Sequence, residues 1–74
     1  MSVDKRLANF LLEEMETKGG DVIAVTHEQI ARYIGSAREV VSRTLKSFYV
    51  LGAVELSRKG VKIIDKKLLR SMSK

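Results

Sequence analysis

Cysteine is absent from this 74-residue chain. Without thiols the fold can hold neither a disulfide bond nor a thiolate metal site, so zinc fingers are excluded. The redox compartment stays undetermined, although a chain without cysteine is compatible with the cytoplasm. The single histidine, His27, has no second histidine or cysteine to join it and is a poor candidate metal ligand. We therefore expect no metal and no cofactor.

Long apolar runs are also missing. No stretch approaches the roughly 18 to 20 apolar residues that a membrane span requires. The first residues, MSVDKRL, lack the apolar centre of a signal peptide. The sequence therefore favours a soluble, cytoplasmic protein that has no membrane partner.

Catalytic motifs are missing as well. The chain has no glycine-rich phosphate loop, and its one histidine lies beside no candidate nucleophile. A chain of this length also leaves little room for a desolvated pocket. We expect no enzyme and no catalytic residue.

What is present is the composition of a folded unit. Apolar residues make up 45% of the chain and charged residues 31%, whereas disordered chains are poorer in Leu, Ile and Val. A chain this short buries only about 60% of its unfolded surface, so there is room for one small core. Residues 1–74 are predicted to form a single domain.

The charges are divided unevenly. Residues 1–31 contain three basic and six acidic residues, while residues 32–74 contain eleven basic and three acidic ones. A lopsided basic surface attracts polyanions, because binding releases their counterions. Nucleic acid is therefore the first partner to consider, and the alternative is that these Lys and Arg residues only keep the chain in solution.

Apolar residues spaced three and four apart predict a first helix over residues 3–18, begun by Ser2 or Asp4 and ended by Gly19 and Gly20. The apolar stripe consists of Val3, Leu7, Phe10, Leu11 and Met15. The opposite face carries three glutamates, Glu13, Glu14 and Glu16. Because these would repel a phosphate backbone, this helix is expected to support the core and not to contact nucleic acid.

Two further helices are predicted to meet at a small turn. Thr26 and Gln29 form a capping-box pattern that starts a helix ending at Gly35, and a second helix is expected over about residues 37–49. Apolar residues at helical spacing would face the core: Ile30, Ala31, Ile34, Val41, Leu45 and Phe48. Polar residues of the second helix would face outward: Arg38, Glu39, Ser42, Arg43 and Lys46. This pattern is typical of a helix-turn-helix that binds DNA.

Short strands are predicted on both sides of this helix pair. Residues 21–25 form a β-branched run, and the segments AVELS and VKIID alternate about the loop RKG as a β-hairpin would. Four residues would point one way, Val54, Leu56, Val61 and Ile63, and Glu55 and Lys62 the other. Ile64 breaks the alternation and is expected to pack against a helix edge, and Asp65 would cap a last helical turn within 66–72. The predicted fold class is α+β and mostly helical: a winged helix-turn-helix with a three-helix core, a short strand and a β-hairpin wing.

Four segments in register carry a resemblance to a known family. They are T-x-E-x-I-A-x-x-I-G, R-E-x-V-S-R-T-L, L-G-x-V-E-L and I-I-D. Over roughly residues 4–69 the chain resembles the C-terminal DNA-binding domain of the CRP/FNR family, the catabolite activator and fumarate-nitrate regulators of bacteria. The resemblance implies sequence-specific binding of double-stranded DNA by a transcription regulator, with the helix at about residues 37–49 in the major groove.

The resemblance also implies roles for single residues. Arg38, Glu39 and Arg43 match positions that contact base edges, and Ser42 matches a position that contacts a base in some members. Thr26 and His27 match positions that meet phosphates. Five more residues are expected at the DNA backbone from their position or charge: Ser36, Lys46, Arg58, Lys59 and Lys62.

The chain departs from the family pattern at three points. Ala37 replaces a Ser or Thr, so a helix cap is lost unless Ser36 serves, and Thr44 replaces an aliphatic residue, which is expected to loosen the packing slightly. Full-length members carry an N-terminal β-roll effector domain and a dimerisation helix, and the sequence matches neither. In the parent regulator two such domains are expected to bind an inverted repeat, and RNA polymerase is a candidate partner.

Several alternatives stay open. The polar strip could be a solvated helix face in which Glu39 and Arg43 pair, and the wing charges could be ordinary hairpin charges. His27 could be a surface residue or a phosphate donor. The rival function is a winged helix that binds a protein, but such a surface should be apolar at its centre. Phe48 and Tyr49 are expected to pack in the core and at the helix end, and not to stack on bases.

Overall fold

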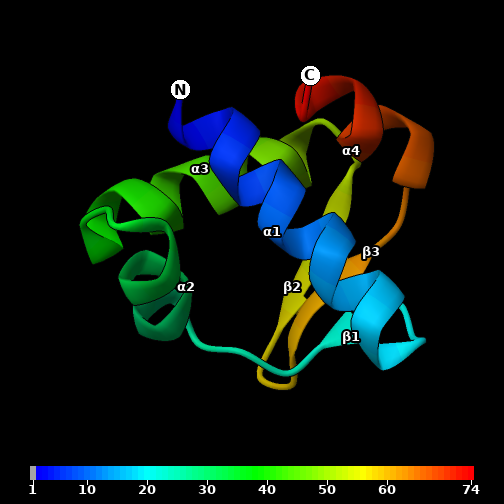
Figure 1. Cartoon of the computed structure of the whole chain (residues 1–74), viewed down its shortest axis with the longest axis horizontal. Helices are drawn as coiled ribbons and strands as arrows, with labels where there is room; N and C mark the ends of the chain where they lie inside the picture. Colours follow the sequence, from blue (N-terminus) through cyan, green and yellow to red (C-terminus); the bar gives the residue numbers. More distant parts are fainter. Residues whose placement is uncertain (1) are drawn as a thin grey trace.

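The structure, a computed structural model, describes residues 2–74, which form four helices and three short strands (Figure 1). In chain order they are α1 (Val3–Lys18), β1 (Val22–Ile23), α2 (His27–Ile34), α3 (Arg38–Val50), β2 (Val54–Ser57), β3 (Gly60–Ile63) and α4 (Lys66–Met72). The strands make one antiparallel sheet in the order β1-β3-β2. Since α2 and α3 form the helix pair and β2 and β3 form the wing, the predicted winged helix-turn-helix is confirmed.

Helix α1 begins where the sequence indicates. Of the two candidate caps, Ser2 is the one used: its hydroxyl accepts a hydrogen bond from the Lys5 N–H at 3.3 Å. The helix ends at Gly19, whose N–H donates to the Met15 carbonyl at 2.9 Å. Four of the five residues of the predicted stripe are buried, and Val3, the first residue of the helix, is half-buried.

Local hydrogen bonds define both ends of α2. The Thr26 hydroxyl accepts from the Gln29 N–H at 3.1 Å, and the Thr26 N–H donates to the Gln29 side chain at 2.9 Å, so the predicted capping box is confirmed. Gly35 ends α2 with a φ of 69°, a left-handed conformation that costs glycine nothing. The next N–H, of Ser36, donates back to the Ala31 carbonyl at 2.9 Å. The chain therefore enters α3 after three residues, Gly35, Ser36 and Ala37.

Helix α3 starts without a side-chain cap. Ala37 occupies the cap position and makes no capping hydrogen bond, and Ser36 does not replace it. Thr44 is buried, but its hydroxyl donates to the Val40 carbonyl at 2.8 Å, so the polar atom has a partner inside the helix. Phe48 lies in the core as predicted, whereas Tyr49 is 54% exposed, so the prediction that it packs at the helix end is wrong.

The wing is a tight hairpin that is held against β1. Val54 pairs with Ile63 and Leu56 with Val61, and Gly60 lies so close to β1 that a Cβ added to it would be 2.0 Å from the Ile23 carbonyl oxygen. No other residue fits there without moving the wing. The predicted inward residues are buried except Leu56, which is half-buried, and Glu55 and Lys62 are exposed as predicted.

Three expectations about the sheet and the tail need correction. The strand predicted over residues 21–25 is only two residues long, because the chain turns when the Val25 N–H donates to the Ile23 carbonyl at 3.0 Å. Ile64 is 51% exposed and does not pack against a helix edge. The last helical turn is in fact the seven-residue α4, which Asp65 caps by accepting from the Leu68 N–H at 3.0 Å.

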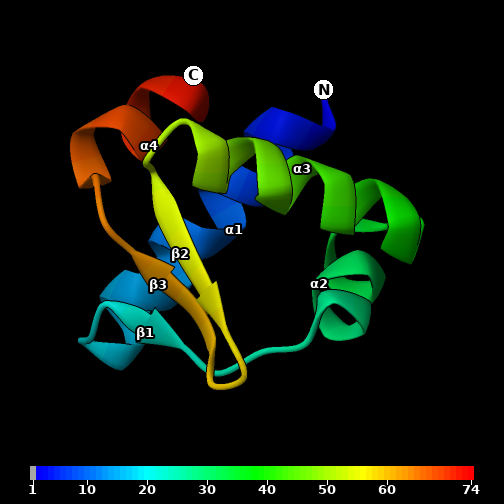
Figure 2. The ribbon, with the colours of Figure 1, turned by 180° about the vertical axis from the view of Figure 1, so that it is seen from behind.

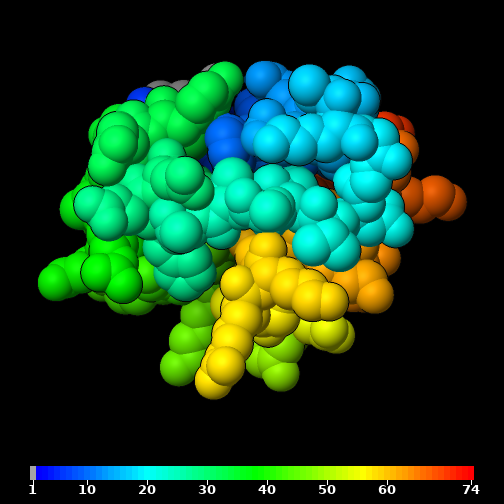
Figure 3. Space-filling model, turned by 90° about the horizontal axis from the view of Figure 1, so that it is seen from below, coloured from blue at the N-terminus to red at the C-terminus, as the bar shows by residue number. Residues whose placement is uncertain are grey.

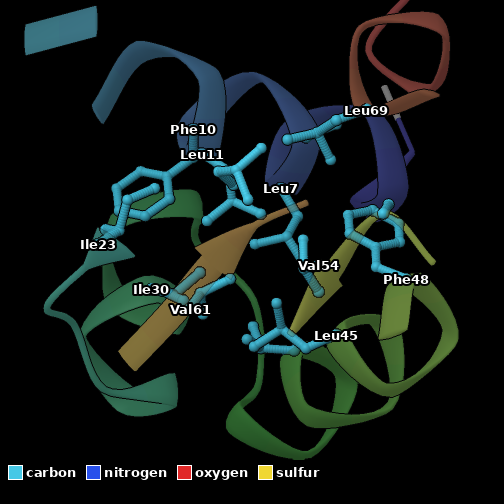
Figure 4. Packing of buried hydrophobic residues seen from close by; sticks show 14 of the residues in the cluster. Leu7, Phe10, Leu11, Ile23, Ile30, Leu45, Phe48, Val54, Val61 and Leu69 are labelled. Carbon is cyan, nitrogen blue, oxygen red and sulfur yellow. The ribbon is translucent and has the colours of Figure 1, made fainter. Parts of the chain in front are cut away.

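One core joins the helices to the sheet (Figure 4). Fully buried side chains come from every element: Leu7, Leu11, Ile23, Ile30, Leu45, Phe48, Val54, Val61 and Leu69. Burying each contributes about 1.5–3 kcal/mol. Figure 2 shows α3 and the hairpin on one side of the molecule with α1 behind them, and in both ribbon views the two termini lie at the end opposite the wing tip. Within residues 2–74 no helix is long and apolar enough to cross a lipid bilayer.

Candidate nucleic-acid interface

The outer face of α3 is polar, and its charges form no ion pair within residues 2–74. Arg38, Glu39, Arg43 and Lys46 are exposed. Among residues 2–74 the ion pairs are Glu14–Lys18 and Glu28–Arg32, so the alternative pairing of Glu39 with Arg43 is not formed. The first turns of α3 line a shallow open hollow made by Ala37, Arg38, Glu39, Ser42 and Arg43. These donors and acceptors are therefore available to a ligand from solvent.

A second depression lies between the start of α2 and the wing tip. It is an open cleft of about 400 Å³. Its lining residues are Val25, Thr26, His27, Glu28, Arg38, Ser57, Arg58 and Gly60. Arg38 belongs to both the hollow and the cleft, so it connects the outer face of α3 with the wing.

The start of α2 supplies backbone donors to this cleft. The capping box satisfies the N–H groups of Thr26 and Gln29. The N–H groups of His27 and Glu28, in the first turn, have no acceptor inside the helix and point toward its N-terminus. The helix dipole adds partial positive charge there, and the Arg38 and Arg58 side chains add more. Glu28 is the one acidic lining residue, and Arg32 lies 3.7 Å from its carboxylate.

The wing tip carries Arg58 and Lys59, both exposed. The Ser57 hydroxyl accepts from the Lys59 N–H at 3.2 Å, which shapes the turn. Lys62 is exposed farther along β3, opposite Glu55 on β2. In Figure 3, viewed from the wing-tip end, long side chains of α3 (green) and of the wing (yellow) project from the same side of the molecule.

Two contacts between elements escaped the sequence analysis. The Arg6 guanidinium of α1 donates to the Ile34 carbonyl in the last turn of α2. Nδ1 of His27 lies 2.8 Å from the Ser42 hydroxyl, and both residues are half-buried. Ser42 lines the hollow on the outer face of α3 as expected, but its hydroxyl also has a partner on α2. Each contact depends on the angle at which two helices cross, and no spacing in the sequence reports that angle. The only available signal was that Arg6 and His27 are polar residues next to predicted apolar faces.

The far end of α3 differs from its beginning. Tyr49, Val50 and Leu51 are 54%, 73% and 57% exposed, so the helix ends in a small apolar surface. The centre of the outer face, from Arg38 to Lys46, remains polar and charged. Protein-binding surfaces are depleted of charge at their centre, so the arrangement favours a polyanion over a protein as ligand.

Known proteins resemble this chain in sequence, and they indicate the family to which it belongs. Residues 5–72 match the family model described as the Crp-like helix-turn-helix domain. The protein of Lacticaseibacillus casei named "Probable transcriptional regulator flp" is 36% identical over 66 residues, which cover 86% of this chain and 30% of that protein.

Solved structures agree with this match. A transcriptional regulator described as a CRP/FNR-family member, from Eubacterium rectale, is 47% identical with a TM-score of 0.94, over 97% of this chain and 33% of that one. The catabolite activator protein of Thermus thermophilus is 28% identical with a TM-score of 0.88, over 95% of this chain and 33% of that one. The chain thus spans about a third of the length of these relatives.

Proposed function

This chain belongs to the family of Crp-like helix-turn-helix domains, the DNA-binding modules of CRP/FNR transcription regulators, and from that premise we propose how it binds DNA. It binds a specific sequence of double-stranded DNA through the outer face of α3, the start of α2 and the wing. The family is one of DNA-binding domains and not a class of enzymes. The observation that carries the proposal is the set of exposed charges on α3, unpaired within residues 2–74, beside a cleft lined by a helix N-terminus and two arginines.

The outer face of α3 lies in the major groove. Arg38 and Arg43 each offer a planar fork of N–H donors, which fits O6 and N7 of guanine. Glu39 accepts from N4 of cytosine. Each such contact discriminates against a wrong base by about 1–3 kcal/mol. All three side chains are exposed and none is held in an ion pair within residues 2–74, so binding breaks no contact inside the domain.

DNA phosphates contact the residues that surround α3. The cleft between α2 and the wing receives one phosphate, which the first-turn N–H groups of α2, His27 and Arg58 surround. Further backbone contacts come from exposed or half-buried residues on the same elements: Thr26, Ser36, Lys46, Lys59 and Lys62. These contacts carry no sequence information and make the affinity fall with rising salt concentration.

In the parent protein two such domains bind the halves of an inverted repeat whose centres lie about one helical turn of DNA apart. This chain spans about a third of the length of its relatives, so the proposal made for it is limited to DNA binding and assigns it no role in dimerisation, effector binding or contact with RNA polymerase. A regulator of chromosomal DNA in bacteria acts in the cytoplasm, which is where we place it.

A selection from random duplex DNA tests this function. The domain is fused to a dimerising helix and used to enrich binding sites over several rounds. We expect an inverted repeat to emerge. Recovery of no enriched motif would contradict sequence-specific binding and favour the winged helix as a protein-binding module.

A further inference from the structure

The hydrogen bond between His27 and Ser42 joins the two helices of the helix-turn-helix. His27 is the first residue of α2, and Ser42 lies in the second turn of α3. Nδ1 of His27 is 2.8 Å from the Ser42 hydroxyl oxygen, and both side chains are half-buried. Among residues 2–74 it is the one hydrogen bond between two side chains, since the others involve a backbone group. The side chain of Ser42 therefore already has a partner in the free domain.

This hydrogen bond at Nδ1 of His27 is linked to the protonation of the other ring nitrogen, Nε2. A neutral imidazole carries one N–H and one bare nitrogen. If the Ser42 hydroxyl donates to Nδ1, the ring proton lies on Nε2, and Nε2 becomes a donor. If Nδ1–H donates to Ser42 instead, Nε2 is a bare acceptor that would face a phosphate unfavourably. The Ser42 hydroxyl can take either role, so the environment of Nε2 decides.

A phosphate bound beside the ring would favour a donor at Nε2. His27 lines the cleft between α2 and the wing together with Glu28, Arg38 and Arg58, and the two arginines attract such a phosphate. The positive end of the α2 dipole lies at the same place. A phosphate in this cleft accepts hydrogen bonds, so a neutral ring that binds it donates from Nε2 and accepts at Nδ1.

Building on the function proposed above, we propose that Ser42 is a positioning residue: its hydroxyl holds the His27 ring so that Nε2–H donates to a DNA phosphate. Ser42 then contributes to affinity through His27 and reads no base itself. This replaces the base contact expected for Ser42 from the sequence. The same hydrogen bond joins α3, which contacts bases, to His27 of α2, which contacts a phosphate. It therefore sets the orientation of α3 in the major groove.

A double-mutant cycle tests the coupling. Ser42→Ala, His27→Ala and the double variant are titrated with the selected site and with random duplex DNA. Ser42→Ala should weaken binding to both DNAs alike, by about 2- to 10-fold, the range of one net hydrogen bond. In the His27→Ala background it should have no further effect. Ser42→Thr keeps the hydroxyl and should bind like the wild type.

The matched control is Ser47→Ala, on the same helix, where the side chain is exposed and makes no hydrogen bond within residues 2–74. It should leave both affinities unchanged. The proposal is overturned if Ser42→Ala changes the preferred base at one position of the site, or if its effect is the same with and without His27.

A measurement on the free domain separates this inference from the proposed function. Nitrogen-15 NMR of the neutral His27 ring reports which nitrogen carries the proton. The wild type and Ser42→Thr should show the Nε2–H form, and Ser42→Ala a mixture of both forms. A dominant Nδ1–H form in the wild type would overturn the inference whether or not the domain selects a DNA motif. Conversely, a failed selection with a fixed Nε2–H ring would overturn the proposed function alone.

Discussion

Helices α1 and α3 are both amphipathic, but the charges on their outer faces differ. With 16 and 13 residues, each buries one apolar face in the shared core. The outer face of α1 is acidic, and its Glu14 is paired with Lys18 at 3.8 Å. The outer face of α3 holds arginines, a glutamate and a lysine without an ion pair inside residues 2–74. The apolar stripe thus decides the fold, while the charges on the opposite face, unpaired within residues 2–74, are the basis on which we propose α3 and not α1 as the helix that contacts DNA.

The largest effects should fall on the inner faces, where the two helices are alike. Leu11 of α1 and Leu45 of α3 are both fully buried. We expect Leu11→Ala and Leu45→Ala each to lower the free energy of unfolding by about 2–5 kcal/mol, because each leaves a cavity in the core. Denaturant unfolding followed by circular dichroism measures both. A loss below about 1 kcal/mol in one of them would show that the helices do not share the core equally.

The next largest effect should distinguish the outer face of α3 from the outer face of α1. Glu39→Ala on α3 is expected to reduce discrimination between the selected site and random duplex by about 1–3 kcal/mol, since a contact to a base edge is lost. Glu13→Ala is the matched change on the exposed face of α1 and should leave discrimination intact. Competition titrations with the two DNAs measure both variants. Equal effects of the two substitutions would remove the distinction between α1 and α3.

A smaller effect should appear at the contact by which α1 supports the helix pair. The Arg6 guanidinium bonds the Ile34 carbonyl, where the helix dipole also favours a cation. Since Arg6 is half-exposed, we expect Arg6→Met to cost about 1 kcal/mol of stability. Lys5→Met, one residue away and exposed, is the control and should cost nothing measurable. An unchanged melting temperature in Arg6→Met would show that α1 supports the turn by apolar packing alone.

The smallest effect should come from the wing. Lys59→Ala is expected to weaken binding to all DNA sequences alike and to lower the slope of log affinity against log salt by about 1, because one phosphate contact is lost. Lys67→Ala on α4 removes the same charge at the end of the molecule away from the wing tip and should leave the slope unchanged (Figure 1). Loss of discrimination in Lys59→Ala would mean that the wing contacts bases.

Local chemistry explains why most of the fold could be predicted from the sequence. The capping box at Thr26, the glycine at position 35 and the alternation of the hairpin each act over a few residues, so the sequence carries them directly. The short β1 could not be predicted in length, because its extent depends on pairing with a distant strand. The exposure of Tyr49 and Ile64 was missed for a similar reason: periodicity predicts a face but not where the covering element ends.

The candidate site was predictable only in part. The outward charges of α3 follow from helical spacing, and the exposed lysines of the wing follow from the hairpin. The two contacts that tie the helices together, from Arg6 to Ile34 and from His27 to Ser42, depend on crossing angles that packing sets. Such contacts decide which polar side chains already have a partner inside the domain, and the partner of Ser42 on α2 could not be predicted from helical spacing.

The most direct test of the central claim, that the free charges of α3 contact bases, is the affinity of Arg43→Ala for the selected site and for random duplex at one salt concentration. We expect the ratio of the two affinities to fall by roughly 5- to 150-fold, the equivalent of about 1–3 kcal/mol. Thermal unfolding should be unchanged, since Arg43 is exposed. An equal loss of affinity for both DNAs would contradict the account, because Arg43 would then bind only the backbone.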